Sequence, residues 1–178
     1  MIDRIAGIIK NDVVNGIGVC VSVFTQGCPH HCKGCFNPET WDKNGGYEVE
    51  DLELKIVKDI NANGIQRNLS ILGGEPLYKN NRNLVMRLVT TAKQIYPSIK
   101  IFIWTGYTIE QLQKARISDD ELNIILNNTN YIIDGLFNET QRDYSLWLRG
   151  SRNQNVYELT KEKEYVKIDK IEGEIVRL

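Results

Sequence analysis

The sequence predicts an α/β fold built on a parallel sheet, because segments with strand patterning alternate with segments of helical patterning along most of the chain. Two further observations support this class. Short apolar runs of strand length are each followed by polar or glycine-rich residues, and motifs that cap helix N-termini stand between later runs. No repeat, low-complexity tract or linker interrupts the series, so we expect residues 1–178 to form a single domain.

Four short runs rich in β-branched and aromatic residues are the predicted strands. In chain order they cover Ile17–Phe24, Asn68–Leu72, Lys100–Trp104 and Asn130–Asp134. The first run alternates apolar side chains from Ile17 to Val23 and places Cys20 on the opposite parity. We therefore expect Cys20 to be a buried and chemically inert thiol.

Four segments carry helix signals. They are Tyr47–Ile60, Asn83–Tyr96, Thr108–Gln111 and Ser118–Glu121. The first two contain apolar residues at helical spacing, and we expect Leu84, Leu88 and Ile95 to share one face of the second helix. The last two resemble capping boxes, in which a hydroxyl and a following Gln or Glu side chain satisfy free backbone N–H groups.

A cysteine-rich loop follows the first predicted strand. Residues 28–35 read Cys-Pro-His-His-Cys-Lys-Gly-Cys, with three cysteines spaced C-x3-C-x2-C. A closed structural metal site uses four protein ligands, whereas three thiolates on a four-iron cluster leave one iron open to an exogenous ligand. Glycines and a proline within the loop allow the tight bends that turn the thiols inward. We therefore expect a 4Fe-4S cluster held by Cys28, Cys32 and Cys35.

Two other interpretations of the cysteines are open. A zinc site could combine the three thiols with His30 or His31, but both histidines lie inside the cysteine loop and no downstream Cys or His pair completes the usual spacing. A disulfide framework is disfavoured, because four clustered cysteines without a secretory signal suit a reducing compartment. We expect His30 and His31 to be exposed loop residues.

The composition is that of an ordinary globular domain, with 42% hydrophobic residues, 25% charged residues and a net charge of −1. A chain of this length buries roughly 70% of its unfolded surface. The absence of a basic stripe predicts no nucleic-acid partner, and no apolar run approaches the roughly 20 residues that span a membrane. The N-terminus lacks the apolar core of a secretory signal, so we expect a cytoplasmic protein.

The candidate chemistry follows the predicted strands. The cysteine loop comes after the first strand and Gly73-Gly74-Glu75-Pro76 after the second. Thr105-Gly106-Tyr107 follows the third strand, and Asp134-Gly135 ends the fourth. Because the carboxyl ends of parallel strands meet at the same edge of a sheet, we expect these four segments to converge on one mouth.

Together, the three cysteines and the Gly73-Gly74-Glu75-Pro76 turn resemble the radical S-adenosylmethionine (SAM) superfamily. Further strings are Asn15-Gly-Ile-Gly18, Gln26-Gly27-Cys28, Gly34-Cys35-Phe36-Asn37, Trp41, Trp104-Thr-Gly-Tyr107, Asp134-Gly135, Leu148-Arg-Gly-Ser151 and Asn153-Gln154. Over nearly the whole chain these resemble the activating proteins of anaerobic ribonucleoside-triphosphate reductases. One departure is that Gly34 stands where the superfamily prefers an aromatic residue, and Phe36 follows the last cysteine instead.

The resemblance implies an incomplete parallel (β/α) barrel with the site at the C-terminal ends of the strands. It also implies that the open iron binds the amino and carboxylate groups of SAM. The implied SAM-binding residues are Gly34, Cys35, Phe36, Gly73, Gly74, Glu75, Thr105 and Asp134. In this interpretation Gly73 and Gly74 let backbone carbonyls approach the methionine ammonium, while Thr105 and Asp134 contact the carboxylate region or a monovalent cation. For Asp134, capping of a strand-end turn is an equal alternative.

The implied activity is reductive cleavage of SAM, followed by hydrogen abstraction from a glycine of the reductase large subunit. This requires an external electron donor. Trp41, Tyr107 and Trp147 are candidate anchors for the partner. A polar string, Arg149, Arg152, Asn153 and Gln154, contacts the partner or the methionine carboxylate, or is a solvated loop. A small-molecule radical SAM synthase and a non-enzymatic Fe-S or zinc module are the alternative functions, and the sequence assigns no catalytic side chain.

Overall fold

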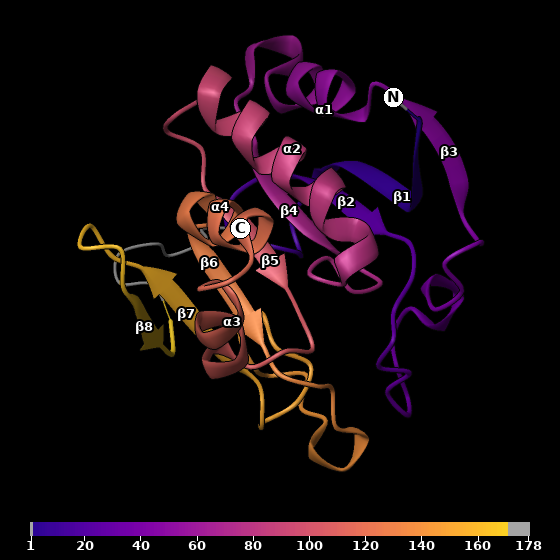
Figure 1. Ribbon diagram of the computed structural model, residues 1–178, viewed down its shortest axis with the longest axis vertical. Helices are drawn as coiled ribbons and strands as arrows, with labels where there is room; N and C mark the ends of the chain where they lie inside the picture. Colours follow the sequence, from indigo (N-terminus) through magenta and orange to yellow (C-terminus); the bar gives the residue numbers. More distant parts are fainter. Residues whose placement is uncertain (1, 171–178) are drawn as a thin grey trace.

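The computed structural model describes residues 2–170, which build one eight-stranded sheet of order β3-β1-β2-β4-β5-β6-β7-β8 (Figure 1). The strands are β1 (Ile2–Asp12), β2 (Cys20–Thr25), β3 (Tyr47–Glu50), β4 (Asn68–Gly73), β5 (Ile101–Trp104), β6 (Tyr131–Asp134), β7 (Asn155–Leu159) and β8 (Tyr165–Ile168). The α-helices are α1 (Leu52–Ile60), α2 (Lys79–Ile95), α3 (Ile109–Ala115) and α4 (Asp120–Asn128). Short 3-10 turns are η1 (Pro38–Thr40), η2 (Ala62–Gly64) and η3 (Glu139–Gln141).

The prediction of an α/β fold is confirmed, but the sheet is mixed. Its four central strands, β2, β4, β5 and β6, are parallel, and they are the four strands predicted from the sequence. An antiparallel pair extends each edge, with β1 and β3 on one side and β7 and β8 on the other. These four outer strands were not predicted from the sequence, because their half-exposed positions interrupt the apolar alternation.

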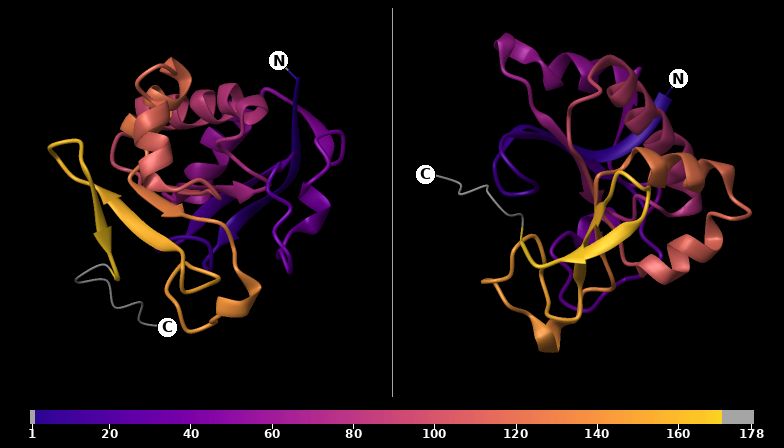
Figure 2. Two further views of the ribbon diagram at one scale, coloured as in Figure 1. Left: turned by 60° about the horizontal axis from the view of Figure 1, so that its bottom comes forward. Right: turned by 90° about the vertical axis from the view of Figure 1, so that its left-hand side faces the viewer.

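The helices cover one face of this sheet, as both side views show (Figure 2). Strand residues of one parity, such as Val21, Leu69 and Ile101, are fully buried beneath them in the main hydrophobic core. Leu84 and Leu88 of α2 join this core as predicted. Ile95, expected on the same face, is 46% exposed at the end of α2, so that expectation was wrong. No helix within residues 2–170 is long and apolar enough to cross a membrane.

The opposite face of the sheet carries a smaller apolar cluster. Phe102 and Tyr131 stack with ring centroids 4.8 Å apart, and Cys20 is fully buried beside them. Burial raises the pKa of the Cys20 thiol, as expected for an inert cysteine. Ile17 and Leu148 pack against this cluster from the loops 13–19 and 142–154, leaving the part of the face nearest the strand ends open.

Two predicted boundaries at the start of elements were wrong. Strand β2 begins at Cys20 rather than Ile17, because Gly18 has a φ of +66°, which an extended strand does not allow. Tyr47–Glu50, assigned to a helix, is strand β3 paired with β1. Within this strand only Val49 is buried, because β3 lies at the edge of the sheet, and α1 begins at Leu52.

The two capping signals differ in outcome. Thr108 forms the predicted capping box at the start of α3, since its hydroxyl accepts from the Gln111 N–H and the Gln111 side chain accepts from the Thr108 N–H. At α4 the cap is Asp119, whose carboxylate accepts from the Leu122 N–H, so the prediction of Ser118 was one residue early. Arg82 also pairs with Asp119, which ties α4 to α2.

Candidate functional site

A cavity of about 600 Å3 opens at the carboxyl ends of the four parallel strands, on the face that the helices leave uncovered. Its walls include Phe24, Leu72 and Trp104, which lie within the last two residues of β2, β4 and β5. The cavity also brings together loop residues far apart in the sequence. These are Cys28, His30, Cys32, Cys35, Phe36, Gly73, Gly74, Glu75, Thr105, Gly106, Gly135, Phe137 and Arg149. The segments expected to converge therefore meet in one place, although Asp134 itself does not line the cavity.

Cys28, Cys32 and Cys35 all line this cavity and are all partly buried, whereas Cys20 lies in the apolar cluster behind it. The loop that carries them is held at its start by the Cys28 N–H, which donates to the Trp41 carbonyl at 3.1 Å. Further along, the Cys35 N–H donates to the Cys32 carbonyl at 3.1 Å, which closes a tight turn. Three thiols from one short loop thus open on a single space.

The donor set fits a cubane cluster. Burial raises the pKa of the Cys28 and Cys32 thiols, and the negative charge of Glu75 adds to the effect at both. A bound cationic metal centre would offset this cost, because coordination deprotonates a thiol. Within residues 2–170 no three His, Cys, Asp or Glu side chains are grouped closely enough to hold one metal ion. Thiolates on a cubane each bind a different iron and do not need to meet at one point.

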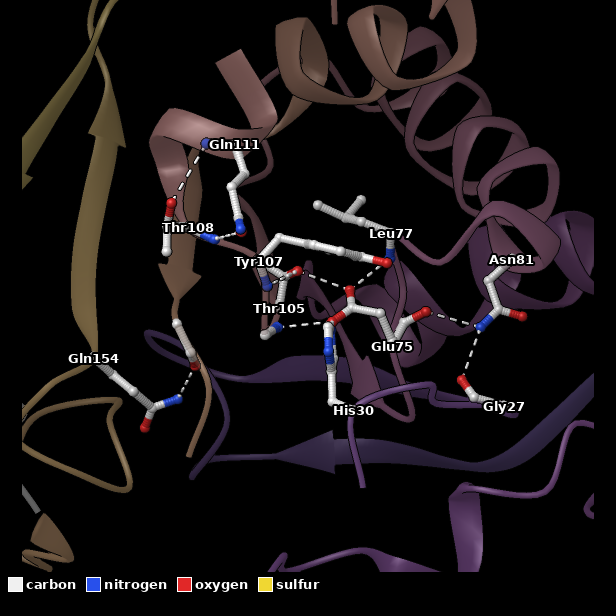
Figure 3. A network of polar contacts seen from close by, with 12 residues as sticks. Gly27, His30, Glu75, Leu77, Asn81, Thr105, Tyr107, Thr108, Gln111 and Gln154 are labelled. Atoms are coloured by element: carbon white, nitrogen blue, oxygen red, sulfur yellow. Dashed lines mark hydrogen bonds and ion pairs between the residues drawn. The ribbon is translucent and has the colours of Figure 1, made fainter. Parts of the chain in front are cut away.

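Glu75 is the centre of a buried hydrogen-bond network (Figure 3). It is 1% exposed, and its Oε1 accepts from the Leu77 N–H at 2.9 Å and the Thr105 hydroxyl at 2.7 Å. Its Oε2 accepts from the Gly106 N–H at 2.7 Å and lies 2.9 Å from Nε2 of His30. Glu75 and Thr105 are therefore bonded to each other, although the sequence interpretation directed both toward a ligand.

The two histidines of the cysteine loop differ in position. His31 is exposed, as expected, and stacks on Trp41 with centroids 4.8 Å apart. His30 was expected to be exposed as well, and this was wrong: its side chain is only 16% exposed because the ring points inward to Glu75 and Tyr107. The sequence offers no signal that separates these neighbours, since the distinction depends on where the loop crosses the end of β5.

The Gly73-Gly74 turn is shaped by packing against the cysteine loop. Gly73 has a φ of +97°, which favours glycine. A Cβ on Gly74 would lie 2.6 Å from the Gly27 carbonyl oxygen and 3.0 Å from that of Thr25. The Glu75 N–H donates to the Gly27 carbonyl at 2.9 Å, so the turn and the cysteine loop touch through their backbones. Both glycines line the cavity, where the Gly74 N–H already donates to the Thr25 carbonyl at 2.9 Å.

Phe36 lies on the exposed side of the cavity, whereas Gly34, which was also expected to contact SAM, is exposed and does not line the cavity. Phe36 is 55% exposed and makes an edge contact with Phe137, with centroids 5.2 Å apart. The Arg142 guanidinium lies 5.3 Å and 5.2 Å from these two ring centroids and donates to the Gly34 carbonyl at 3.0 Å. Arg142 thereby holds the loop after β6 against Gly34 and Phe36, the two residues that flank Cys35.

Asp134 acts within the fold. Its Oδ2 accepts from the Ile109 N–H at 2.8 Å at the start of α3, and its Oδ1 accepts from the backbone and side-chain N–H groups of Asn155 at 3.2 Å and 3.0 Å. The carboxylate is 1% exposed. This arrangement matches the alternative of a strand-end cap.

The polar string divides between the cavity and its surroundings. Arg149 and Gln154 line the cavity, and the buried Nε of Arg149 has no hydrogen-bond partner among the described residues. Nη1 of Arg149 donates to the Gln154 carbonyl at 3.3 Å. Arg152 and Asn153 turn away, to Asp143 and to the Leu136 carbonyl. Arg149 is therefore a cation at the cavity wall, and its Nε–H group is a hydrogen-bond donor without a partner among the described residues.

Several cavity residues were not singled out from the sequence, among them Val14, Phe137 and Leu146. The Trp104 indole N–H donates to the Leu148 carbonyl at 2.8 Å, which closes the wall between β5 and the late loop. Of the three aromatic anchors proposed for a partner, Tyr107 and Trp147 pack against the two hydrophobic clusters instead. Trp41 lies against His31 at the edge of a second groove of about 460 Å3 that Cys28 also lines.

Comparison with known proteins agrees with this site. A family model described as a 4Fe-4S single cluster domain matches residues 14–157. An anaerobic ribonucleoside-triphosphate reductase-activating protein of Vibrio cholerae serotype O1 is 38% identical over 151 residues, covering 84% of this chain and 94% of the relative. Proteins of the same name from Escherichia coli strain K12 and Enterobacteria phage T4 are 35% and 34% identical, covering 83% and 84% of this chain and 94% and 90% of their own. The chain therefore belongs to the family of anaerobic ribonucleoside-triphosphate reductase-activating proteins.

Proposed function

We propose that the protein is a radical SAM activase that makes a glycyl radical on the large subunit of anaerobic ribonucleotide reductase. The observation that carries the proposal is the opening of three thiols of one loop onto the same cavity as the Gly73-Gly74 turn. In the overall reaction one electron and one SAM give methionine and 5′-deoxyadenosine. The sulfonium–ribose C–S bond breaks, and the ribose carbon takes the α-hydrogen of a glycine, which keeps the unpaired electron.

Cys28, Cys32 and Cys35 would hold the 4Fe-4S cluster, which supplies a single electron at low potential when bound. The other residues bind and orient SAM. Gly73 and Gly74 would offer backbone carbonyls to the methionine ammonium, and the Arg149 guanidinium, whose Nε has no partner among the described residues, would offer charge-assisted bonds to the carboxylate. The Phe36 ring would lie beside the adenine as an apolar face, whereas Gly34 does not line the cavity and its carbonyl already accepts from Arg142. No residue is assigned as an acid or base, because the reaction as written needs none.

In this proposal Glu75, Thr105 and Asp134 are structural residues and not SAM contacts. Their oxygens already accept hydrogen bonds from the protein, so they act mainly by holding the turn and the strand ends in place. The monovalent cation considered for Thr105 and Asp134 has no support from this geometry, since Asp134 does not line the cavity. The SAM contacts therefore fall on backbone groups, Arg149 and Phe36.

We further propose that the open sheet is the incomplete barrel of the radical SAM type, in a single domain of residues 1–178. The parallel centre, the helices on one face and the cavity at the strand ends support this. The partner names carried by the relatives support the reductase large subunit as the macromolecular substrate. An external reductant is required by the electron balance, and free thiols suit a reducing compartment, the cytoplasm.

Product analysis tests this proposal. Reduced, cluster-loaded protein incubated with SAM and the large subunit is expected to release methionine and 5′-deoxyadenosine in equal amounts. Alanine in place of any of the three loop cysteines should abolish both products, whereas Cys20→Ala should not. A fully loaded cluster without SAM cleavage would indicate an electron-transfer module instead. Cleavage that depends on a small metabolite and not on the large subunit would favour a small-molecule synthase.

A further inference from the structure

His30 sits in a slot that three other residues shape. Its Nε2 lies 2.9 Å from Oε2 of Glu75. Its ring makes an edge contact with Tyr107, with centroids 4.8 Å apart and planes at 73°. A Cβ on Gly106 would lie 2.5 Å from Cδ2 and 2.7 Å from Nε2 of His30, so the ring occupies space that only glycine leaves free. The slot lies between the ends of β4 and β5, as Figure 3 shows for His30, Glu75 and Tyr107.

The other side of the His30 contact is rigid. Glu75 is fixed by the backbone N–H groups of Leu77 and Gly106 and by the Thr105 hydroxyl, whatever His30 does. A buried carboxylate with these donors has a single orientation, because rotating it would leave bonds unmade in a low-dielectric site. Its remaining acceptor position points at the cysteine loop, where His30 supplies the partner.

The cysteine loop needs such an attachment between its first two thiols. Among the described residues, His30 is the one side chain between Cys28 and Cys32 that forms a hydrogen bond with another part of the protein. Pro29 is exposed, and His31 adopts a φ of +48°, a value that costs energy for a residue with a side chain. A strained backbone of this kind persists only where contacts with the surrounding structure hold it in place.

We propose that His30 is a positioning residue for the iron-sulfur site: through Glu75 it locks the Cys28–Cys32 segment to the ends of β4 and β5. The inference rests on the proposed function only in taking the three thiols as cluster ligands. In this inference Glu75 acts by contacting other protein residues and not SAM, because its carboxylate joins the Gly-Gly turn to the cysteine loop. The same contact couples the wall that SAM would touch to the segment that would hold the iron.

Iron retention tests this inference. Holoprotein is reconstituted anaerobically, and the rate at which a ferrous chelator removes iron is measured together with the electron paramagnetic resonance spectrum of the reduced cluster. Partners that orient metal ligands typically contribute 10- to 100-fold to metal affinity. We expect His30→Ala to lose iron about 10-fold faster or more, and to show a changed reduced-cluster spectrum. His30→Gln, which keeps a donor of similar reach, should recover much of the difference.

Two further variants separate positioning from general damage. His31→Ala changes the neighbouring histidine, which is exposed and stacked on Trp41, and should retain iron like the wild type. Gly106→Ala expels the His30 ring from the other side and should lose iron as His30→Ala does. Because both changes break the same contact between His30 and Glu75, the double variant should lose iron no faster than either single variant.

Wild-type iron retention and spectrum in His30→Ala would overturn the inference, and so would equal losses in His31→Ala or fully additive losses in the double variant. These readouts do not require SAM cleavage. A wild-type protein that holds the cluster but makes no radical would therefore overturn the proposed function and leave this test intact. A wild-type protein that takes up no cluster would overturn both.

Discussion

The α-carbon of Gly74 packs so closely on the cysteine loop that a side chain there would lie 2.6 Å from the carbonyl oxygen of Gly27. Gly27 directly precedes Cys28, and the same carbonyl accepts the Glu75 N–H at 2.9 Å. The glycine pair after β4 and the thiols after β2 are therefore one packed unit. From the sequence we expected the absence of a side chain at Gly74 to make room for SAM. In the structure it makes room for the loop that bears the thiols.

This contact predicts the effect of Gly74→Val. The branched side chain would displace the Gly27 carbonyl, so we expect reduced iron content as well as weaker SAM binding, and a loss of about 1–3 kcal/mol in the free energy of unfolding. Gly7→Ala is the matched control, since a Cβ there meets nothing within 4 Å and no positive φ is imposed. Iron analysis and denaturant unfolding check both variants. Normal iron content with selective loss of SAM binding would restore the original interpretation.

Cluster stoichiometry provides a second prediction. Anaerobic reconstitution is expected to give about four irons per chain, as a cubane requires. Cys28→Ala, Cys32→Ala and Cys35→Ala should each lose the cluster, while Cys20→Ala should keep it, because Cys20 is buried behind the cavity. Iron and sulfide analysis with visible absorption measures this. Iron that survives the loss of a loop cysteine but not of Cys20 would show that the ligands are assigned wrongly.

A third prediction concerns Arg149. Its buried Nε has no partner within the described chain and its side chain lines the cavity. A hydrogen bond to a charged group contributes about 1.5–3 kcal/mol, so Arg149→Gln should weaken SAM binding by roughly 10- to 100-fold. Calorimetric titration of the cluster-loaded protein measures the affinity. Arg152→Gln is the control, because Arg152 pairs with Asp143 outside the cavity. Equal effects of the two changes would remove Arg149 from the binding site.

Asp134 should behave as a structural residue. Asp134→Ala removes the acceptor for the first N–H of α3 and for Asn155, so we expect a loss of about 1–2 kcal/mol in the free energy of unfolding. The SAM affinity of the folded variant should stay within about 2-fold of the wild type, since the carboxylate does not line the cavity. Unfolding curves and calorimetry provide the two values. A large loss of SAM affinity at unchanged stability would favour a ligand contact instead.

The parallel centre of the sheet was predicted because its strands are buried on both faces and read as short runs rich in apolar, β-branched and aromatic residues. The outer strands were not predicted, because β3 buries only Val49 and β8 has no fully buried residue. The three thiols were predicted because their spacing is local. The roles of His30 and Glu75 were not predicted, because each is decided by which loop another element places within hydrogen-bond distance. For Asp134 the strand-end cap was one of two alternatives, and the sequence alone did not choose between them.

The most direct test of the central claim is the electron paramagnetic resonance spectrum after reduced protein, SAM and the reductase large subunit are mixed. The account predicts an organic radical with a doublet splitting, because a glycyl radical keeps one α-hydrogen. The doublet should collapse when the glycine of the large subunit is deuterated at its α-carbon. An absent radical with an intact, reduced cluster and bound SAM would contradict the account, as would a radical signal that α-deuteration leaves unchanged.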